Sequence, residues 1–153
     1  MPLKNFGIVS PGVYRGGQPD EHGVRMLRDM GVTAILKLNA ENESDVEEDL
    51  DGIVVWRVPL EIGLPPFEDL LQMVGQINAY VQQREPVFIH CTHGRDRTGF
   101  VVAAYELLVL KRSYAEVDES RAAYGVNDAV HRFFNRDFTR ALKLLVEKGR
   151  YGD

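Results

Sequence analysis

The sequence has only one cysteine among its 153 residues, which excludes an internal disulfide framework and a zinc site built from several thiolates. No apolar run approaches the roughly 20 residues that a membrane-spanning helix needs, and the first residues lack the apolar core of a signal peptide. Repeats, low-complexity tracts and Pro/Gly/Ser-rich linkers are also missing. These absences favour a cytoplasmic protein in which residues 1–153 form one domain, long enough to bury a sizeable core.

The net charge of −5 is unevenly distributed along the chain. Seven acidic residues and no basic one lie between Glu41 and Asp51, whereas elsewhere 18 basic side chains stand against the remaining 16 of the 23 acidic ones. Such a run is most often a solvated face or loop, and it receives no chemical role here. The acidic balance therefore does not argue against an anionic ligand.

Hydrophobic spacing predicts strands that alternate with helices in the first two thirds of the chain and helices alone thereafter. The predicted strands are a hairpin over 6–15 and the segments 33–38, 53–58 and 86–90; the predicted helices are 20–30, 67–84, 100–110, 115–124 and 129–147. This order indicates an α/β fold with a central, mostly parallel sheet of four to five strands flanked by helices on both faces. Ligands of such folds lie beyond the carboxyl ends of the strands, so the residues after Leu38, Val58 and His90 become candidates.

The segment after the last predicted strand combines several anion-binding features. It reads His90-Cys91-Thr92-His93-Gly94-Arg95-Asp96-Arg97-Thr98-Gly99 and leads into an apolar helix. Successive backbone N–H groups from Thr92 to Arg97 and the positive end of the helix would hold a phosphate, and Gly94 permits a left-handed turn. Arg97 offers a planar fork for two phosphate oxygens, and the same donors would favour the thiolate of Cys91.

The spacing Cys-x5-Arg followed by Thr-Gly resembles the signature loop of the protein tyrosine phosphatase superfamily, in particular its compact dual-specificity branch. The segment Tyr14-Arg15-Gly16-Gly17-Gln18-Pro19 is similar to an entry motif of small dual-specificity-like phosphatases, and the order of elements follows the same family. A lone cysteine at a strand end is usually a small buried hydrophobe, but here the whole set of loop positions matches.

The resemblance implies a role for each loop residue. Cys91 attacks phosphorus and becomes a phosphocysteine, while Arg97 and the loop amides hold the equatorial oxygens. Thr98 donates a hydrogen bond to the sulfur as it leaves, and His90 positions the cysteine from behind. Neither a metal nor another cofactor is expected, because these donors neutralise the charge that develops in the transition state.

The general acid of this family is missing from its usual place. Members carry an aspartate in the loop after the preceding strand, where Ile62 stands in this sequence, although acid assistance is typically worth 10²–10⁴-fold. Asp96 is the first candidate to replace it, because a bound phosphate dianion would keep a facing carboxyl group protonated. Reaction without a protein acid and catalysis by Glu61 are the alternatives; Asp69 is explained by the dipole of its helix.

Additional basic residues point to a substrate with several phosphates. His93 and Arg95 would line the rim of the loop, and possible substrate contacts elsewhere are Arg15, Lys37, Arg57 and Glu61. A further basic stripe on the last predicted helix has the ordinary reading of a solvated face, and its members are Arg132, Arg136, Arg140 and Lys143.

The favoured substrate is therefore an inositol polyphosphate, as in the phytase-like members of the superfamily. Phosphotyrosine, a phosphoinositide and the triphosphate end of an RNA are alternative substrates. The RNA is disfavoured because the sequence has few aromatic and basic clusters of the kind that hold nucleic acid. A phospho-binding module without turnover is the alternative outside the enzymes.

Overall fold

The computed structural model describes residues 3–39, 52–60, 65–125 and 147 of the chain. These residues form strands and helices in the order β1 (Gly7–Ser10), β2 (Val13–Gly16), α1 (Glu21–Asp29), β3 (Ala34–Lys37), β4 (Val54–Arg57), α2 (Phe67–Gln82), β5 (Val87–His90), α3 (Asp96–Leu108) and α4 (Tyr114–Ala123). No helix among them is both long and apolar enough to cross a bilayer. The helix predicted over 129–147 lies outside the described residues, apart from residue 147 itself.

The strands form one sheet in the order β1-β2-β5-β3-β4. β1 and β2 are antiparallel and are joined by the turn at Pro11 and Gly12, whereas the pairs β2–β5, β5–β3 and β3–β4 are parallel. The prediction of a mostly parallel sheet of four to five strands is confirmed. Because the parallel strands run in one direction, their carboxyl ends meet at one edge of the sheet.

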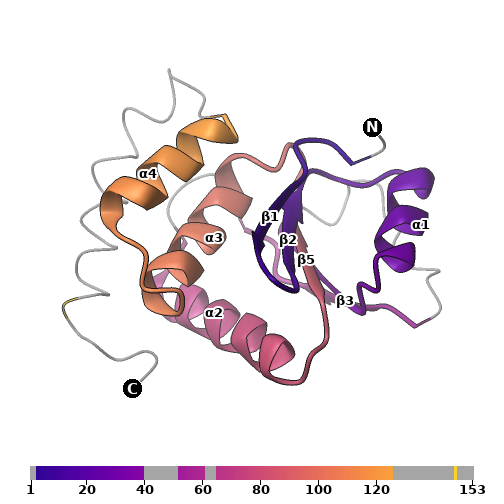
Figure 1. Ribbon diagram of the computed structural model, residues 1–153, viewed down its shortest axis with the longest axis horizontal. Coiled ribbons are helices and arrows are strands. Elements are labelled where there is room, and N and C mark those ends of the chain that lie inside the picture. The colour runs from indigo at the N-terminus through magenta and orange to yellow at the C-terminus, as the bar shows by residue number, and fades with distance from the viewer. Residues whose placement is uncertain (1–2, 40–51, 61–64, 126–146, 148–153) are drawn as a thin grey trace.

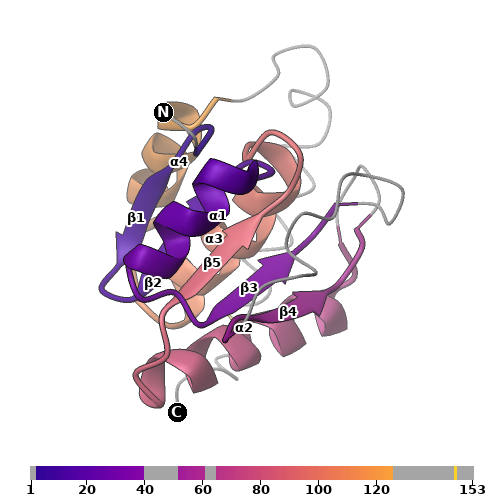
Figure 2. The same cartoon turned by 90° about the vertical axis from the view of Figure 1, so that its right-hand side faces the viewer.

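Helices cover both faces of the sheet, as predicted. Figures 1 and 2 show α1 on one face and α2, α3 and α4 on the other. Alternation along the strands divides the core in the same way: Ala34 and Leu36 of β3 pack in the cluster that contains α2 and α3, whereas Ile35 packs with Leu27 of α1. The fold is thus a three-layer arrangement with two apolar cores.

Local signals explain the boundaries of α1. The Asp20 side chain accepts a hydrogen bond from the Gly23 N–H at 2.7 Å, so it caps the first turn, and Gly31 with φ +89° follows the end of the helix. The predicted cap and stop are therefore both confirmed.

α3 is the buried helix that the sequence predicted. Every residue from Thr98 to Leu108 is buried, so this helix lies inside the protein rather than on its surface. It begins at Asp96 instead of residue 100, because the last residues of the Cys-x5-Arg segment already have helical conformation. The phosphate-loop sequence and the buried helix are consequently one continuous unit.

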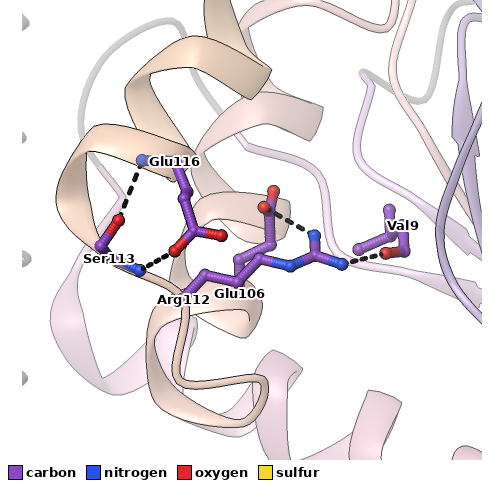
Figure 3. A network of polar contacts seen from close by, with 5 residues as sticks. All are labelled: Val9, Glu106, Arg112, Ser113 and Glu116. Carbon is purple, nitrogen blue, oxygen red and sulfur yellow. Dashed lines mark hydrogen bonds and ion pairs between the residues drawn. The ribbon is translucent and has the colours of Figure 1, made fainter.

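A polar network fixes the connection between α3 and α4 (Figure 3). The buried Glu106 accepts a hydrogen bond from Arg112 Nη1 at 2.9 Å, and Arg112 Nη2 donates to the Val9 carbonyl of β1 at 2.8 Å. Ser113 and Glu116 then form a capping box that starts α4. α4 is in this way anchored to α3 and to the edge of the sheet.

Candidate active site

Four residues form a row across the carboxyl edge of the sheet. Gly16 pairs with His90, His90 with Lys37, and Lys37 with Arg57 in the registers of the four parallel strands. The segments that follow these residues therefore leave the sheet side by side. The candidate loop begins here, directly after His90.

The Cys-x5-Arg segment is a short loop that enters a helix without a side-chain cap. β5 ends at His90, α3 starts at Asp96, and its N-cap residue Arg95 makes no side-chain cap hydrogen bond. The first N–H groups of a helix have no acceptor within the helix, and the helix dipole adds positive potential there. The loop thus presents backbone donors at the place where the sequence predicted an anion.

Arg97 folds back across this loop. Its Nη2 donates to Thr92 Oγ1 at 3.0 Å, so the two ends of the segment are joined. Cys91 lies at the floor with 2% of its surface exposed and packs against the α3 side of the sheet. His90 is buried below it, with Nδ1 3.3 Å from the Cys91 carbonyl oxygen and its ring stacked on Phe88. The guanidinium is thereby held over the loop that contains the sulfur.

Two loop side chains hold buried polar atoms that have no hydrogen-bond partner among the described residues. These atoms are Thr98 Oγ1 and Arg95 Nε. The hydrogen bond that the resemblance implies, from Thr98 to the sulfur as it leaves in the second step, stays a prediction. Buried donors of this kind usually have partners, so both are suited to a bound group. His93 is exposed beside them.

The conformation of the loop depends on close approach between backbones. Gly94 has φ +70°, and a Cβ on it would lie 2.6 Å from the Gly16 carbonyl oxygen and the Gly17 nitrogen. A Cβ on Gly17 would lie 2.9 Å from the Thr92 oxygen, and the Gln18 N–H donates to that same oxygen at 3.0 Å. The two glycines after Arg15 are therefore needed for contact with the loop, a role that sequence reasoning did not assign to them.

The carbonyl of Gly94 accepts hydrogen bonds from two side chains far away in the sequence. Asn5 Nδ2 donates to it at 3.2 Å and Arg15 Nη2 at 3.1 Å. Asn5 also donates to the Tyr124 carbonyl at 2.7 Å, and the Arg15 guanidinium lies 3.9 Å from the centre of the Tyr124 ring. Arg15, predicted as a possible substrate contact, is buried in this structure, and its side chain donates to the loop carbonyl.

The other residues predicted as possible substrate contacts are Lys37, Arg57 and Glu61. Lys37 is buried, and its Nζ donates to Gln18 Oε1 at 3.2 Å; Asn39 donates to the same oxygen at 2.6 Å. Arg57 is exposed at the end of β4. Glu61 lies outside the described residues, as do Ile62 and the basic stripe of the last predicted helix.

Asp96 has a basic neighbour from α4. Asp96 and Phe100 are one helical turn apart in α3, and the buried Arg121 guanidinium lies 5.7 Å from the centre of the Phe100 ring. Burial lowers the pKa of Arg121, and the carboxylates of Asp118 and Asp96 act in the opposite direction. The loop carboxylate is therefore attracted to a cation on another helix. Asp69 lies in the first turn of α2.

No group of three or more His, Cys, Asp or Glu side chains in residues 3–39, 52–60, 65–125 and 147 is arranged to hold a metal ion.

The mostly parallel sheet and the Cys-x5-Arg segment at the start of a buried helix agree with the fold that the sequence led us to expect. A family model described as "Polymorphic toxin system, DSP-PTPase phosphatase" matches residues 9–111. The chain belongs to this family of dual-specificity-type phosphatases.

Individual relatives are distant. The inositol diphosphatase DSP4 of Arabidopsis thaliana is 29% identical over 108 residues, covering 67% of this chain and 54% of the relative. The dual specificity protein phosphatase TpbA of Pseudomonas aeruginosa is 28% identical over 115 residues, covering 71% and 49%. The chain spans about half the length of these curated relatives. The core catalytic domain of the PP-IP phosphatase SIW14 from S. cerevisiae, solved with citrate, shares the fold with a TM-score of 0.74 and 20% identity, covering 100% of this chain and 97% of that one.

Proposed function

We propose that the protein is a cysteine-dependent phosphomonoester hydrolase whose substrate is an inositol polyphosphate. The observation that carries the proposal is the Arg97 guanidinium folded back to Thr92 over the loop that starts with Cys91. Nucleophile, guanidinium and helix N-terminus then converge on one phosphate group.

In the first step the sulfur of Cys91 attacks phosphorus and the bond between phosphorus and the ester oxygen breaks. The leaving oxygen takes a proton, and the phosphoryl group stays on the sulfur. Arg97 and the backbone N–H groups of the loop neutralise the charge on the three equatorial oxygens. The nucleophile in this step is the thiolate form of the cysteine.

In the second step water attacks phosphorus and the bond between sulfur and phosphorus breaks, which returns Cys91 and releases inorganic phosphate. The buried Oγ1 of Thr98, without a hydrogen-bond partner in the described part of the chain, is proposed to donate to the departing sulfur. His90 supports the cysteine from below.

Asp96 is proposed as the proton donor to the leaving oxygen. It is the first residue of α3 and belongs to the loop itself. The attraction of Arg121 opposes this role, because a neighbouring cation favours the ionised carboxylate, whereas a bound phosphate dianion favours the protonated form. Catalysis without a protein acid, or by Glu61, are the alternatives.

The preference for a substrate with several phosphates is supported by the basic side chains at the loop. Arg95 has a buried Nε without a partner in the described ranges, and His93 and Arg57 are exposed near the same edge. The similarity to an inositol diphosphatase over 67% of the chain supports the same class. Phosphotyrosine is the second candidate, because the similarly distant TpbA is a dual specificity protein phosphatase.

The test is phosphate release without added metal from inositol hexakisphosphate, a phosphotyrosine peptide, a phosphoinositide and a triphosphate-ended RNA. We expect turnover that is fastest on the inositol polyphosphate and is lost in Cys91→Ser. Faster turnover of the peptide would move the assignment to a protein phosphatase. Binding without turnover in the unmodified protein would make it a phospho-binding module.

The acid is tested by the pH–rate profile on the inositol polyphosphate. A general acid must be protonated, so the rate falls as pH rises through its titration, and Asp96→Asn should lose this descending limb. Asp69→Asn, at the start of a different helix, is the matched control that should retain it. An unchanged profile in Asp96→Asn excludes Asp96.

A further inference from the structure

Arg15 is a buried cation that the reaction described above does not use. Only 1% of the surface of Arg15 is exposed. No carboxylate among the described residues forms an ion pair with its guanidinium. A buried charge is costly unless it is paired or compensated. Its position therefore requires an explanation.

The contacts of Arg15 satisfy only part of its guanidinium. Nη2 donates to the Gly94 carbonyl at 3.1 Å and the plane lies over the Tyr124 ring, while Nε and Nη1 are buried without a hydrogen-bond partner in the described ranges. Tyr124 in turn is fixed by its neighbours, because Asn5 donates to its carbonyl and a Cβ on Gly7 would overlap its hydroxyl group. The guanidinium thus has one hydrogen bond and one ring contact, and two of its nitrogens lack a hydrogen-bond partner among the described residues.

The register of the sheet brings Arg15 close to Cys91. Arg15 pairs with Ile89 in the parallel ladder of β2 and β5, and Cys91 follows Ile89 by two residues. Alternation puts side chains two residues apart on the same face, and Cys91 packs in the same core cluster as Ile89 and Val13. Arg15 of β2 and Cys91, which directly follows β5, therefore lie on the same side of the sheet.

The electrostatic surroundings agree with this placement. Burial lowers the pKa of the Arg15 guanidinium and the charge of Arg121 acts in the same direction, while Tyr124, Glu106 and Cys91 raise it. Glu106 belongs to α3 and Arg121 to α4, Tyr124 directly follows α4, and Cys91 begins the loop. Of these, only Cys91 belongs to the site that binds and releases a phosphoryl group.

We infer that Arg15 is a second cation of the site, a positioning residue that acts from behind the loop. It holds the Gly94 carbonyl and stabilises the negative charge that Cys91 carries as a thiolate, without touching the substrate. Arg97 neutralises the phosphate from the solvent side, and Arg15 neutralises the sulfur from the core side. The inference rests on the proposed function, since it assigns the charge compensated by Arg15 to the nucleophile.

The experiment is the pH dependence of alkylation by iodoacetamide, read by mass spectrometry. The chain has one cysteine, so each modification reports Cys91 alone. An opposite charge nearby typically shifts a titration by 1–3 pH units. We expect the midpoint of the alkylation profile to rise by about one pH unit in Arg15→Met and to stay near that of the unmodified protein in Arg15→Lys.

The matched control is Asn5→Ala, which removes a hydrogen bond to the same Gly94 carbonyl but no charge. Its midpoint should not move. An unchanged midpoint in folded Arg15→Met, or an equal rise in Asn5→Ala, overturns the inference. If Arg15→Met does not fold, Arg15→Lys decides, because a rise of about one unit there would show that charge is not the cause.

Alkylation needs no turnover, so this result is separate from the proposed function. A protein that hydrolyses none of the tested esters but shows the shift would refute the hydrolase and leave the role of Arg15 intact. Turnover with no shift would do the reverse.

Discussion

Replacing Gly94 by alanine should damage the site far more than the fold. Gly94 has φ +70°, and so does not tolerate a side chain easily; Gly12, in the turn between β1 and β2, has φ +83°. The left-handed conformation costs an L-residue about 1–2 kcal/mol, and loss of chain entropy in the unfolded state offsets about 0.5 kcal/mol of this. Both substitutions share this backbone term, so Gly12→Ala is the matched control.

The two positions differ in the space around them. An added Cβ meets nothing within 4 Å at Gly12, whereas at Gly94 it would lie 2.6 Å from the Gly16 oxygen and the Gly17 nitrogen, about 0.8 Å closer than ordinary contact at 3.4 Å. The obstacles are backbone atoms, so no rotamer change relieves the overlap and the loop must retreat by roughly that distance. A displacement of about 1 Å in a catalytic constellation can cost on the order of 100-fold in rate.

The assay compares urea unfolding and kcat/KM for an aryl phosphate in the two variants. Gly12→Ala should lose about 1 kcal/mol of stability, or roughly 2–4 °C in Tm, with kcat/KM unchanged. Gly94→Ala should lose at least as much stability and about 100-fold in kcat/KM. If Gly94→Ala keeps kcat/KM within about threefold of Gly12→Ala, the geometric reasoning about the loop is refuted.

Two further predictions concern stability. Arg112→Met leaves the Glu106 carboxylate, which is 2% exposed, without its cation. We expect the free energy of unfolding to fall by about 2–3 kcal/mol. This is less than the roughly 3–5 kcal/mol of a fully buried pair, because the Arg112 side chain is 35% exposed. Arg25→Met, which breaks the exposed pair with Glu21, should change urea unfolding by less than about 0.5 kcal/mol; equal losses in the two variants would contradict the burial argument. Burial raises the pKa of Tyr105, against a hydrogen bond with Ser10 and the charge of Arg112. The folded state thus favours the neutral hydroxyl, and this contribution to stability is lost as pH rises above about 10. Tyr105→Phe should therefore flatten the fall of the unfolding free energy at alkaline pH. An unchanged slope would rule out Tyr105 as the cause.

Features encoded by neighbouring residues could be predicted from the sequence. Asp20 and Gly31 delimit α1 through a side-chain cap and a left-handed stop, both local effects. The apolar strands and the buried helix of the Cys-x5-Arg loop follow from short-range hydrophobicity, and the parallel order follows from their alternation. The start of α3 was misplaced because an apolar pattern does not report the helical turn that the polar residues Asp96 and Arg97 contribute.

The support behind the loop could not be predicted, because it is made of contacts between distant segments. Asn5 and Arg15 meet Gly94 across 89 and 79 residues of sequence, and Asn5 meets Tyr124 across 119. No periodicity marks such a contact. The available signal was the pair Gly16-Gly17 after Arg15, since consecutive glycines at a strand end indicate close backbone approach. A basic residue in that motif was more readily interpreted as facing a ligand than as lying behind one.

The family model covers only some of the segments that surround the loop. The family model ends at residue 111, so it includes the loop, Arg15 and α3 but not α4, which spans Tyr114–Ala123. Yet α4 brings Arg121 towards Asp96, and Tyr124 immediately after it lies on Arg15. Cys91 and Arg97 thus lie in the matched part, whereas the surroundings of Asp96 and of Arg15 depend in part on a segment outside it. A test of proton donation by Asp96 should therefore also vary Arg121 of α4, and not only the residues of the Cys-x5-Arg segment.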